Sequence, residues 1–110
     1  MGRAVNNPEI PVTKGTSGIV LMQAADSQRQ ESIECIRCGR CVNACPMGLE
    51  PYLLMIVSQR KLFDLAEKGR VMDCIECGSC SYTCPSKRPL LDYIRYGKLK
   101  TGQIIRTRKK

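Results

Sequence analysis

The sequence predicts a small, mainly α-helical domain that follows a short β-hairpin. Three observations favour this fold class. Apolar residues recur at helical spacing between two groups of cysteines, a second such stripe follows the last cysteine, and a turn-rich segment separates two short apolar runs near the start. With 110 residues, of which 5% are aromatic, the chain buries little apolar surface. We therefore expect the eight cysteines to contribute to stability.

Residues 1–24 are predicted to form the hairpin. The apolar runs 10–13 and 18–22 flank a segment of turn-forming residues, and Pro8 and Pro11 restrict the first strand to an edge. Asp26 or Ser27 is expected to cap a short helix that leads to the cysteines. The α-helical domain is then assigned to residues 25–97.

Residues 49–68, between the two cysteine groups, are predicted to be helical. Pro51 suits a first helical position, Gly69 suits a stop, and the polar residues 59–61 indicate a break into two short helices. Pro89 is expected to open a further helix that ends near Gly97. The basic residues 98–110 are then predicted to form a frayed tail.

The cysteines form two copies of one unit. Residues 35–46 read CIRCGRCVNACP and residues 74–85 read CIECGSCSYTCP, so each cysteine of the first copy has a counterpart 39 residues later. Both copies follow the pattern C-x2-C-x2-C-x3-C-P. This spacing is typical of a loop that holds a [4Fe–4S] cluster through three thiolates, while the fourth cysteine ligates the other cluster.

The pattern therefore predicts two [4Fe–4S] clusters that exchange their fourth ligands. Gly39 and Gly78 would let the loop backbone approach a cluster, and Pro46 and Pro85 shape the segments after the fourth cysteines. Crossed ligation would staple the two copies together and hold the centres at a separation suited to passing electrons. The first centre is assigned Cys35, Cys38, Cys41 and Cys84, and the second Cys74, Cys77, Cys80 and Cys45.

The composition excludes several classes of function. The chain has no histidine, which rules out histidine-based nucleophilic catalysis and histidine-containing zinc fingers. It has no apolar run long enough to span a membrane. The formal net charge is +8, but two oxidised clusters with their thiolates would lower it to about +4. Nucleic-acid binding is therefore not expected.

Other interpretations of the cysteines stay open. A disulfide framework needs an oxidising compartment, and no secretory signal is visible. Two four-cysteine zinc sites would use the same side chains, although zinc sites usually pair two C-x2-C knuckles. Clusters could also serve as structural staples, or metal could support a basic surface in a non-redox binding module.

The segments around the cysteines resemble the C subunit of the Rnf (Rsx) electron-transport complex. The resemblance is carried by residues 71–78 (VMDCIECG) and 81–86 (SYTCPS), together with residues 11–16 (PVTKGT) and 35–41 (CIRCGRC). The 28 residues between Cys45 and Cys74 also look like the helical linker of α-helical ferredoxins, rather than the shorter linker of small bacterial ferredoxins. The resemblance implies an α-helical ferredoxin-like fold and the same eight cluster ligands, position by position.

The resemblance also implies a role as an electron relay. The family belongs to a complex that couples electron flow between ferredoxin and NAD to ion translocation, and it lies peripherally on the cytoplasmic face of the bacterial inner membrane. The implied partners are other subunits of that complex and a redox partner such as ferredoxin or a flavin domain, with membrane contact through these partners. The alternative is an iron–sulfur subunit of a fumarate- or heterodisulfide-reductase type.

Family members carry an upstream region that binds nucleotide and flavin. No glycine-rich phosphate loop occurs in the present sequence, so FMN and NAD(H) are expected only in that upstream region. We expect this chain to be a carboxy-terminal part with no catalytic residues of its own.

Overall fold

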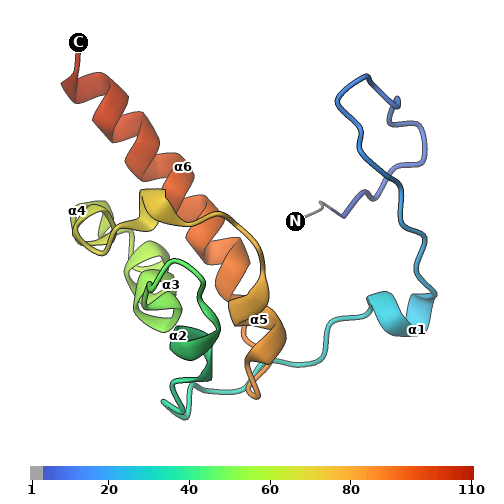
Figure 1. Cartoon of the computed structure of the whole chain (residues 1–110), viewed down its shortest axis with the longest axis horizontal. Helices are drawn as coiled ribbons and strands as arrows, with labels where there is room; N and C mark the ends of the chain where they lie inside the picture. The colour runs from blue at the N-terminus through green and yellow to red at the C-terminus, as the bar shows by residue number, and fades with distance from the viewer. Residues whose placement is uncertain (1–3) are drawn as a thin grey trace. The chain divides into compact units, whose positions relative to one another are not determined.

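The computed structural model describes residues 4–110, and the chain divides into two compact units, residues 1–30 and 31–110. The regular elements within residues 4–110 are helices, without a strand (Figure 1). None of these helices is long and apolar enough to cross a membrane. The elements are α1 (Ala24–Ser27), α2 (Arg40–Ala44), α3 (Pro51–Gln59), α4 (Phe63–Lys68), the 3-10 helix η1 (Val71–Asp73), α5 (Ser79–Thr83) and α6 (Leu90–Arg108).

The β-hairpin predicted for residues 1–24 is wrong, as far as residues 4–24 show; residues 1–3 lie outside the described residues. Of the predicted hairpin, only the turn forms. The Thr16 N–H donates to the Thr13 carbonyl (3.0 Å), and the Thr13 N–H donates to Thr16 Oγ (3.2 Å). The apolar run that was expected to be the second strand stays exposed, with Leu21 at 94%. A two-stranded hairpin is marginal unless its apolar face is buried, which explains why the turn lacks paired flanks.

Helix α1 is a single turn, and its predicted cap is also wrong. Asp26 and Ser27 lie within the helix, while Gln23 occupies the cap position without a side-chain cap bond. Ser27 Oγ instead donates to the Ala24 carbonyl at 3.0 Å. This bond within the turn uses the short polar side chain that the sequence suggested as a cap.

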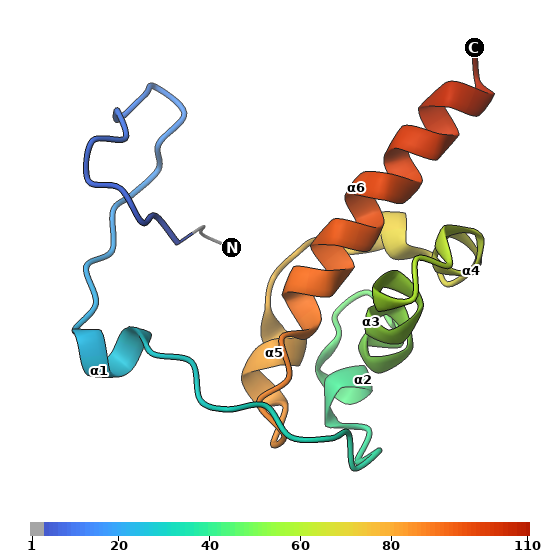
Figure 2. The ribbon, with the colours of Figure 1, turned by 180° about the vertical axis from the view of Figure 1, so that it is seen from behind.

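The second unit is built around α6. Helix α3 packs along it, and α4 and η1 also lie against it (Figures 1 and 2). The core between these helices contains side chains that are at most 2% exposed, so the apolar stripes of α3 and α6 face each other as amphipathic helices require. At the edge of this core the rings of Phe63 and Tyr96 meet edge to face at 6.0 Å. The best-buried apolar residues are Leu54, Ala66, Val71, Leu90 and Ile94.

The predicted break within residues 49–68 is confirmed. Helix α3 begins at Pro51, α4 ends at Lys68, and Gly69 follows as the C-cap. Lys61 adopts a left-handed conformation (φ 59°) between the two helices. Two short helices rather than one long helix therefore pack against α6.

Helix α6 continues past the predicted end at Gly97 and reaches Arg108, so the expectation of a frayed tail is wrong for residues 98–108. Gly97 is buried in the helix and lies against Ser58 of α3; a Cβ added at Gly97 would come 2.0 Å from Ser58 Oγ. The glycine thus allows close helix packing instead of ending the helix. At the far end Arg108 forms ion pairs with Asp64 and Glu67 of α4, both at 2.9 Å.

Helices α2 and α5 occupy equivalent places in the two copies of the cysteine repeat. Each begins directly after the glycine of its loop, Gly39 or Gly78, and ends before the fourth cysteine of its copy. The two helices lie against each other (Figures 1 and 2). Their packing brings the two cysteine loops into one part of the unit.

Candidate metal centres

The two cysteine loops adopt the same unusual backbone conformation. Three residues in or just after each copy have positive φ, and they are related by the 39-residue offset of the repeat. Non-glycine residues occupy half of these positions, although a left-handed conformation costs an ordinary residue roughly 1–2 kcal/mol. The pairs are Arg37 (53°) and Glu76 (57°), Gly39 (74°) and Gly78 (82°), and Gly48 (63°) and Lys87 (51°).

The loop conformation directs backbone N–H groups at cysteine sulfur. The Arg37 N–H donates to Cys35 Sγ, and the equivalent Glu76 N–H donates to Cys74 Sγ, both at 3.4 Å. The Leu49 N–H donates to Cys45 Sγ at 3.4 Å. Such bonds stabilise a negatively charged sulfur, because they place the positive end of a peptide dipole beside it.

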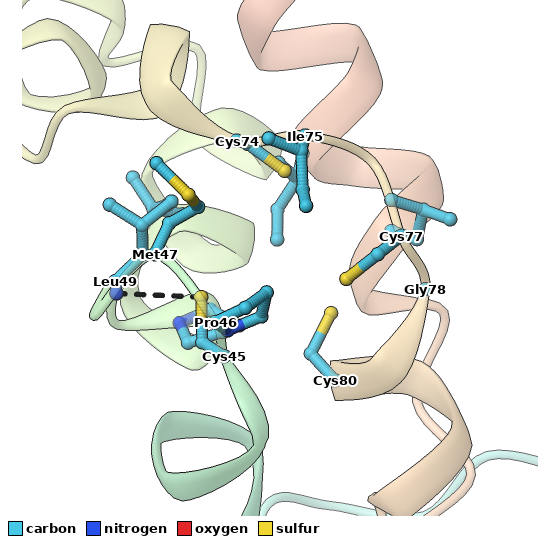
Figure 3. Close-up of a pocket in the computed structure, with 13 residues that line it drawn as sticks. Cys45, Pro46, Met47, Leu49, Cys74, Ile75, Cys77, Gly78 and Cys80 are labelled. Carbon is cyan, nitrogen blue, oxygen red and sulfur yellow. Dashed lines mark hydrogen bonds between the residues drawn. The ribbon is translucent and has the colours of Figure 1, made fainter. Parts of the chain in front are cut away.

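One cavity lies where the second loop meets the end of the first copy. Figure 3 shows the sulfurs of Cys45, Cys74, Cys77 and Cys80 directed into a common space. Pro46 and Gly78 also line this cavity, together with apolar side chains of α3 and α6. The structure therefore brings together the four cysteines that the sequence assigned to the second centre.

A larger and more open recess lies at the first loop. Its lining includes Gly39 and Pro85, and it extends along α3 past Leu53 and Ile56 to Arg60. Cys35 and Cys38 are exposed, whereas Cys41 is buried. The cysteines in the lining are those assigned to the first centre, Cys35, Cys38, Cys41 and Cys84.

Hydrogen bonds explain why Cys84 lies beside the first loop. The Ile33 N–H donates to the Ser86 carbonyl (3.0 Å), and Ser86 Oγ donates to the Glu34 carbonyl (2.9 Å). These two bonds fasten the segment before Cys35 to the segment after Cys84. A residue 52 positions away in sequence thus fixes the start of the first loop.

Burial and hydrogen bonding shift the pKa values of the cysteine thiols in opposite directions. Burial raises the pKa of Cys80 to about 11 and also raises the pKa values of Cys41 and Cys74. Hydrogen bonding to the Ser79 side chain, by contrast, lowers the pKa of Cys77. Burial thus disfavours the thiolate forms of these cysteines, and a bound metal cation would compensate that charge.

The cysteines fit a polynuclear cluster. All eight are free of disulfides. Within residues 4–110, no three Cys, Asp or Glu side chains are placed to hold a single metal ion. Four cysteines line each cavity, and a [4Fe–4S] cluster takes one thiolate at each of its four irons, so the donor set of each cavity fits such a cluster.

The two loops differ in what surrounds them. Glu76 of the second loop is paired with two cations of α6, Arg95 at 3.0 Å and Lys98 at 3.6 Å. The Lys98 ammonium also donates to the Cys74 carbonyl at 2.6 Å. Arg37, the counterpart of Glu76, is exposed and forms no ion pair with any residue from 4 to 110. Helix α6 therefore fixes the second loop and leaves the first without an equivalent support.

Sequence reasoning missed Lys98, Arg95 and Ser86 as residues that hold the loops. Lys98 and Arg95 lie three residues apart and face the same carboxylate, which is the usual spacing of neighbours on a helix. A prediction that the helix continues past Gly97 would have placed Lys98 on the same helix face as Arg95. For Ser86 the sequence gives no signal, because its partners lie in an irregular segment.

The fold and the paired cavities define the chain as a small helical domain that presents two four-cysteine sites. Residues 27–85 match the family described as the 4Fe-4S dicluster domain, and the chain belongs to this family. This result supports the prediction of iron–sulfur clusters over the zinc and disulfide alternatives.

Longer curated proteins are similar to most of the chain. The C subunit of the proton-translocating ferredoxin:NAD(+) oxidoreductase complex of Clostridium ljungdahlii is 50% identical over 87% of the chain and 21% of its own length. Its Na(+)-translocating counterpart in Acetobacterium woodii is 48% identical (82% and 20%), and the C subunit of the ion-translocating oxidoreductase complex of Methanosarcina acetivorans is 47% identical (89% and 22%). The predicted resemblance to the Rnf protein is confirmed, and the chain spans about a fifth of the length of these relatives.

Proposed function

We propose that this chain is an electron-relay domain that carries two [4Fe–4S] clusters. The first would be held by Cys35, Cys38, Cys41 and Cys84, and the second by Cys74, Cys77, Cys80 and Cys45. The observation that carries the proposal is the composition of the cavities, since each is lined by three cysteines of one copy and the fourth of the other. This is the exchange expected for the C-x2-C-x2-C-x3-C-P pattern.

The clusters, when bound, supply one-electron redox chemistry, and the chain supplies position and electrostatics. The N–H groups of Arg37, Glu76 and Leu49 donate to cysteine sulfur and favour added negative charge. The apolar side chains of α3 and α6 exclude water from the second cavity. Because the fourth cysteines cross over, both centres are held in one rigid unit.

The comparisons support a place in a larger complex. The names of the relatives describe ion-translocating oxidoreductases that act on ferredoxin and NAD(+), so we infer that other subunits of such a complex are the partners of this chain. A ferredoxin or flavin domain would exchange electrons with it at the cytoplasmic face of the membrane. FMN and NAD(H) would be bound by parts of the longer relatives outside these 110 residues.

Spectroscopy of anaerobically purified protein tests the proposal. We expect a broad visible absorption that dithionite bleaches reversibly, with electron paramagnetic resonance signals from two interacting centres on reduction. Iron and acid-labile sulfide should be present in equal amounts. A colourless protein that contains zinc in proportion to its cysteines would contradict the proposal.

A further inference from the structure

The two cysteine loops have one backbone conformation but opposite surface chemistry. At the position between the first two cysteines, the first copy has Arg37 and the second has Glu76. At the position after the loop glycine, the first copy has Arg40 and the second has Ser79. The acidic side chain of the second loop is paired with α6, whereas both arginines of the first loop are exposed.

The first loop also leaves its cysteines at the surface. Cys35 and Cys38 are exposed, while their counterparts Cys74 and Cys77 are half-buried. Ile36, which lies between the exposed cysteines, has 65% of its surface accessible. A centre bound here would reach the molecular surface beneath an exposed apolar side chain.

Basic side chains surround this opening. Arg60 and Arg88 line the recess together with Arg37, and Lys87 is exposed beside Arg88. Glu34 and Glu50 are the acidic residues of the same lining. With exposed Arg40 and Lys87 included, five cations face two carboxylates, which leaves a surplus of about one positive charge after the roughly −2 of an oxidised cluster with its thiolates. Cations around an apolar middle are the arrangement that steers a negatively charged protein to a docking site.

We propose that this surface, named here the Arg37 face, is where an acidic one-electron carrier protein docks, so that the first centre is the port of the relay and the second is its interior centre. The Arg37 face consists of Ile36, Arg37, Arg40, Arg60, Lys87 and Arg88. This inference rests on the proposed function. In the step that occurs there, one electron leaves the donor centre and enters the acceptor centre, and no bond forms or breaks.

The repeat itself provides a sharp variant. Arg37→Glu with Arg40→Ser gives the first loop the residues that the second loop has at the same positions. Glu76 shows that glutamate is compatible with the left-handed conformation there (φ 57°), so the loop should keep its fold. A matched control, Arg106→Glu with Lys109→Ser, makes the same change in charge at exposed positions near the end of α6.

Two measurements use the full chain with its clusters and oxidised flavodoxin as the acidic probe. Calorimetry of the fully oxidised proteins measures docking without electron transfer. Stopped-flow mixing of the reduced chain with flavodoxin measures the rate of electron transfer. The oxidation rates by ferricyanide and hexaammineruthenium(III), two small acceptors of opposite charge, report the electrostatic potential at the surface.

For the loop variant we expect flavodoxin to bind about tenfold more weakly and both flavodoxin and ferricyanide to react about tenfold more slowly, while hexaammineruthenium(III) reacts faster. The difference in affinity and rate between the unsubstituted protein and the loop variant should shrink as salt is added. The control variant should change each value by less than about twofold.

Several results would overturn the docking proposal while leaving the proposed function intact. These are an affinity and rate for flavodoxin that the loop substitutions leave unchanged, equal losses in the control and loop variants, or a loop variant that loses binding to phosphatidylglycerol vesicles and keeps its affinity for flavodoxin. Absence of iron signals in the unsubstituted protein would instead refute the proposed function before any docking is measured.

Discussion

The two cysteine loops, residues 35–41 and 74–80, show what a duplicated motif determines and what it does not. Both turn at a left-handed residue between their first two cysteines, both donate that residue's N–H to sulfur at 3.4 Å, and both begin a five-residue helix after glycine. Their surroundings differ, because α6 pairs with the second loop and leaves the first exposed. Local sequence thus sets the loop conformation, while distant residues set its exposure and charge.

The largest effect is expected when both loops lose their metal. Chelation of iron under anaerobic conditions should unfold much of residues 35–97 and lower the helical circular dichroism accordingly, because the core is small and metal-binding free energy becomes folding free energy. Reconstitution with iron and sulfide should restore the signal. An iron-free protein with an unchanged helical spectrum would show that the clusters are not the scaffold.

Substituting each fourth cysteine in turn should show which centre it ligates. Cys84→Ser is expected to damage the centre at Cys35, Cys38 and Cys41, although Cys84 belongs to the second copy. Paramagnetic resonance of the reduced protein should then show the signal of the second centre retained and that of the first lost or altered. Cys45→Ser is the matched control and should give the opposite pattern.

Selective loss of the signal from the Cys74 centre in the Cys84→Ser variant would contradict the exchange. Each copy would then hold a cluster with its own four cysteines.

Replacing the glycine of either loop should lower the free energy of unfolding by a similar amount. A Cβ at Gly39 meets no atom within 4 Å, and one at Gly78 is 3.5 Å from Leu91, so space is not limiting. Gly39→Ala and Gly78→Ala should each lower the free energy of unfolding by roughly 1–2 kcal/mol because of positive φ. Gly102→Ala, inside α6, is the control and should stabilise by about 0.5–1 kcal/mol.

Anaerobic urea denaturation measures these changes. If Gly39→Ala were neutral while Gly78→Ala was costly, the two loops would not share one backbone conformation in solution.

The smallest effect concerns the support that only the second loop receives from α6 within the described residues. Lys98→Met removes a positive charge that contacts the Cys74 carbonyl, so the reduction potential of the second centre should fall by tens of millivolts. The potential of the first centre should stay unchanged in a redox titration. Lys100→Met, on another face of α6, is the control; a shift of both centres in both variants would indicate a general charge effect.

Much of the site could be predicted because its information is local. The cysteine spacing fixed which sulfurs share a loop, and the break between α3 and α4 followed from Pro51, Gly69 and the polar residues between them. The exchange of fourth cysteines between the cavities also came from the motif rather than from any long-range pattern, and the ligand assignment stays a prediction.

The errors arose where packing decides. Gly97 is predicted to stop the helix, but its lack of a side chain instead allows α3 and α6 to approach closely at Ser58. The apolar run near Val20 is predicted to form a strand, yet a strand needs a partner and a buried face, and Val20 is 84% exposed. Neither the close approach at Gly97 nor the lack of a partner for the Val20 run can be inferred from periodicity in one segment.

Anomalous X-ray diffraction at the iron absorption edge, on crystals of anaerobically purified protein, tests the central claim most directly. We expect two separate iron peaks, one bounded by Cys35, Cys38, Cys41 and Cys84 and the other by Cys74, Cys77, Cys80 and Cys45. A single peak, zinc in place of iron, or a cluster bound by the four cysteines of one copy would contradict it.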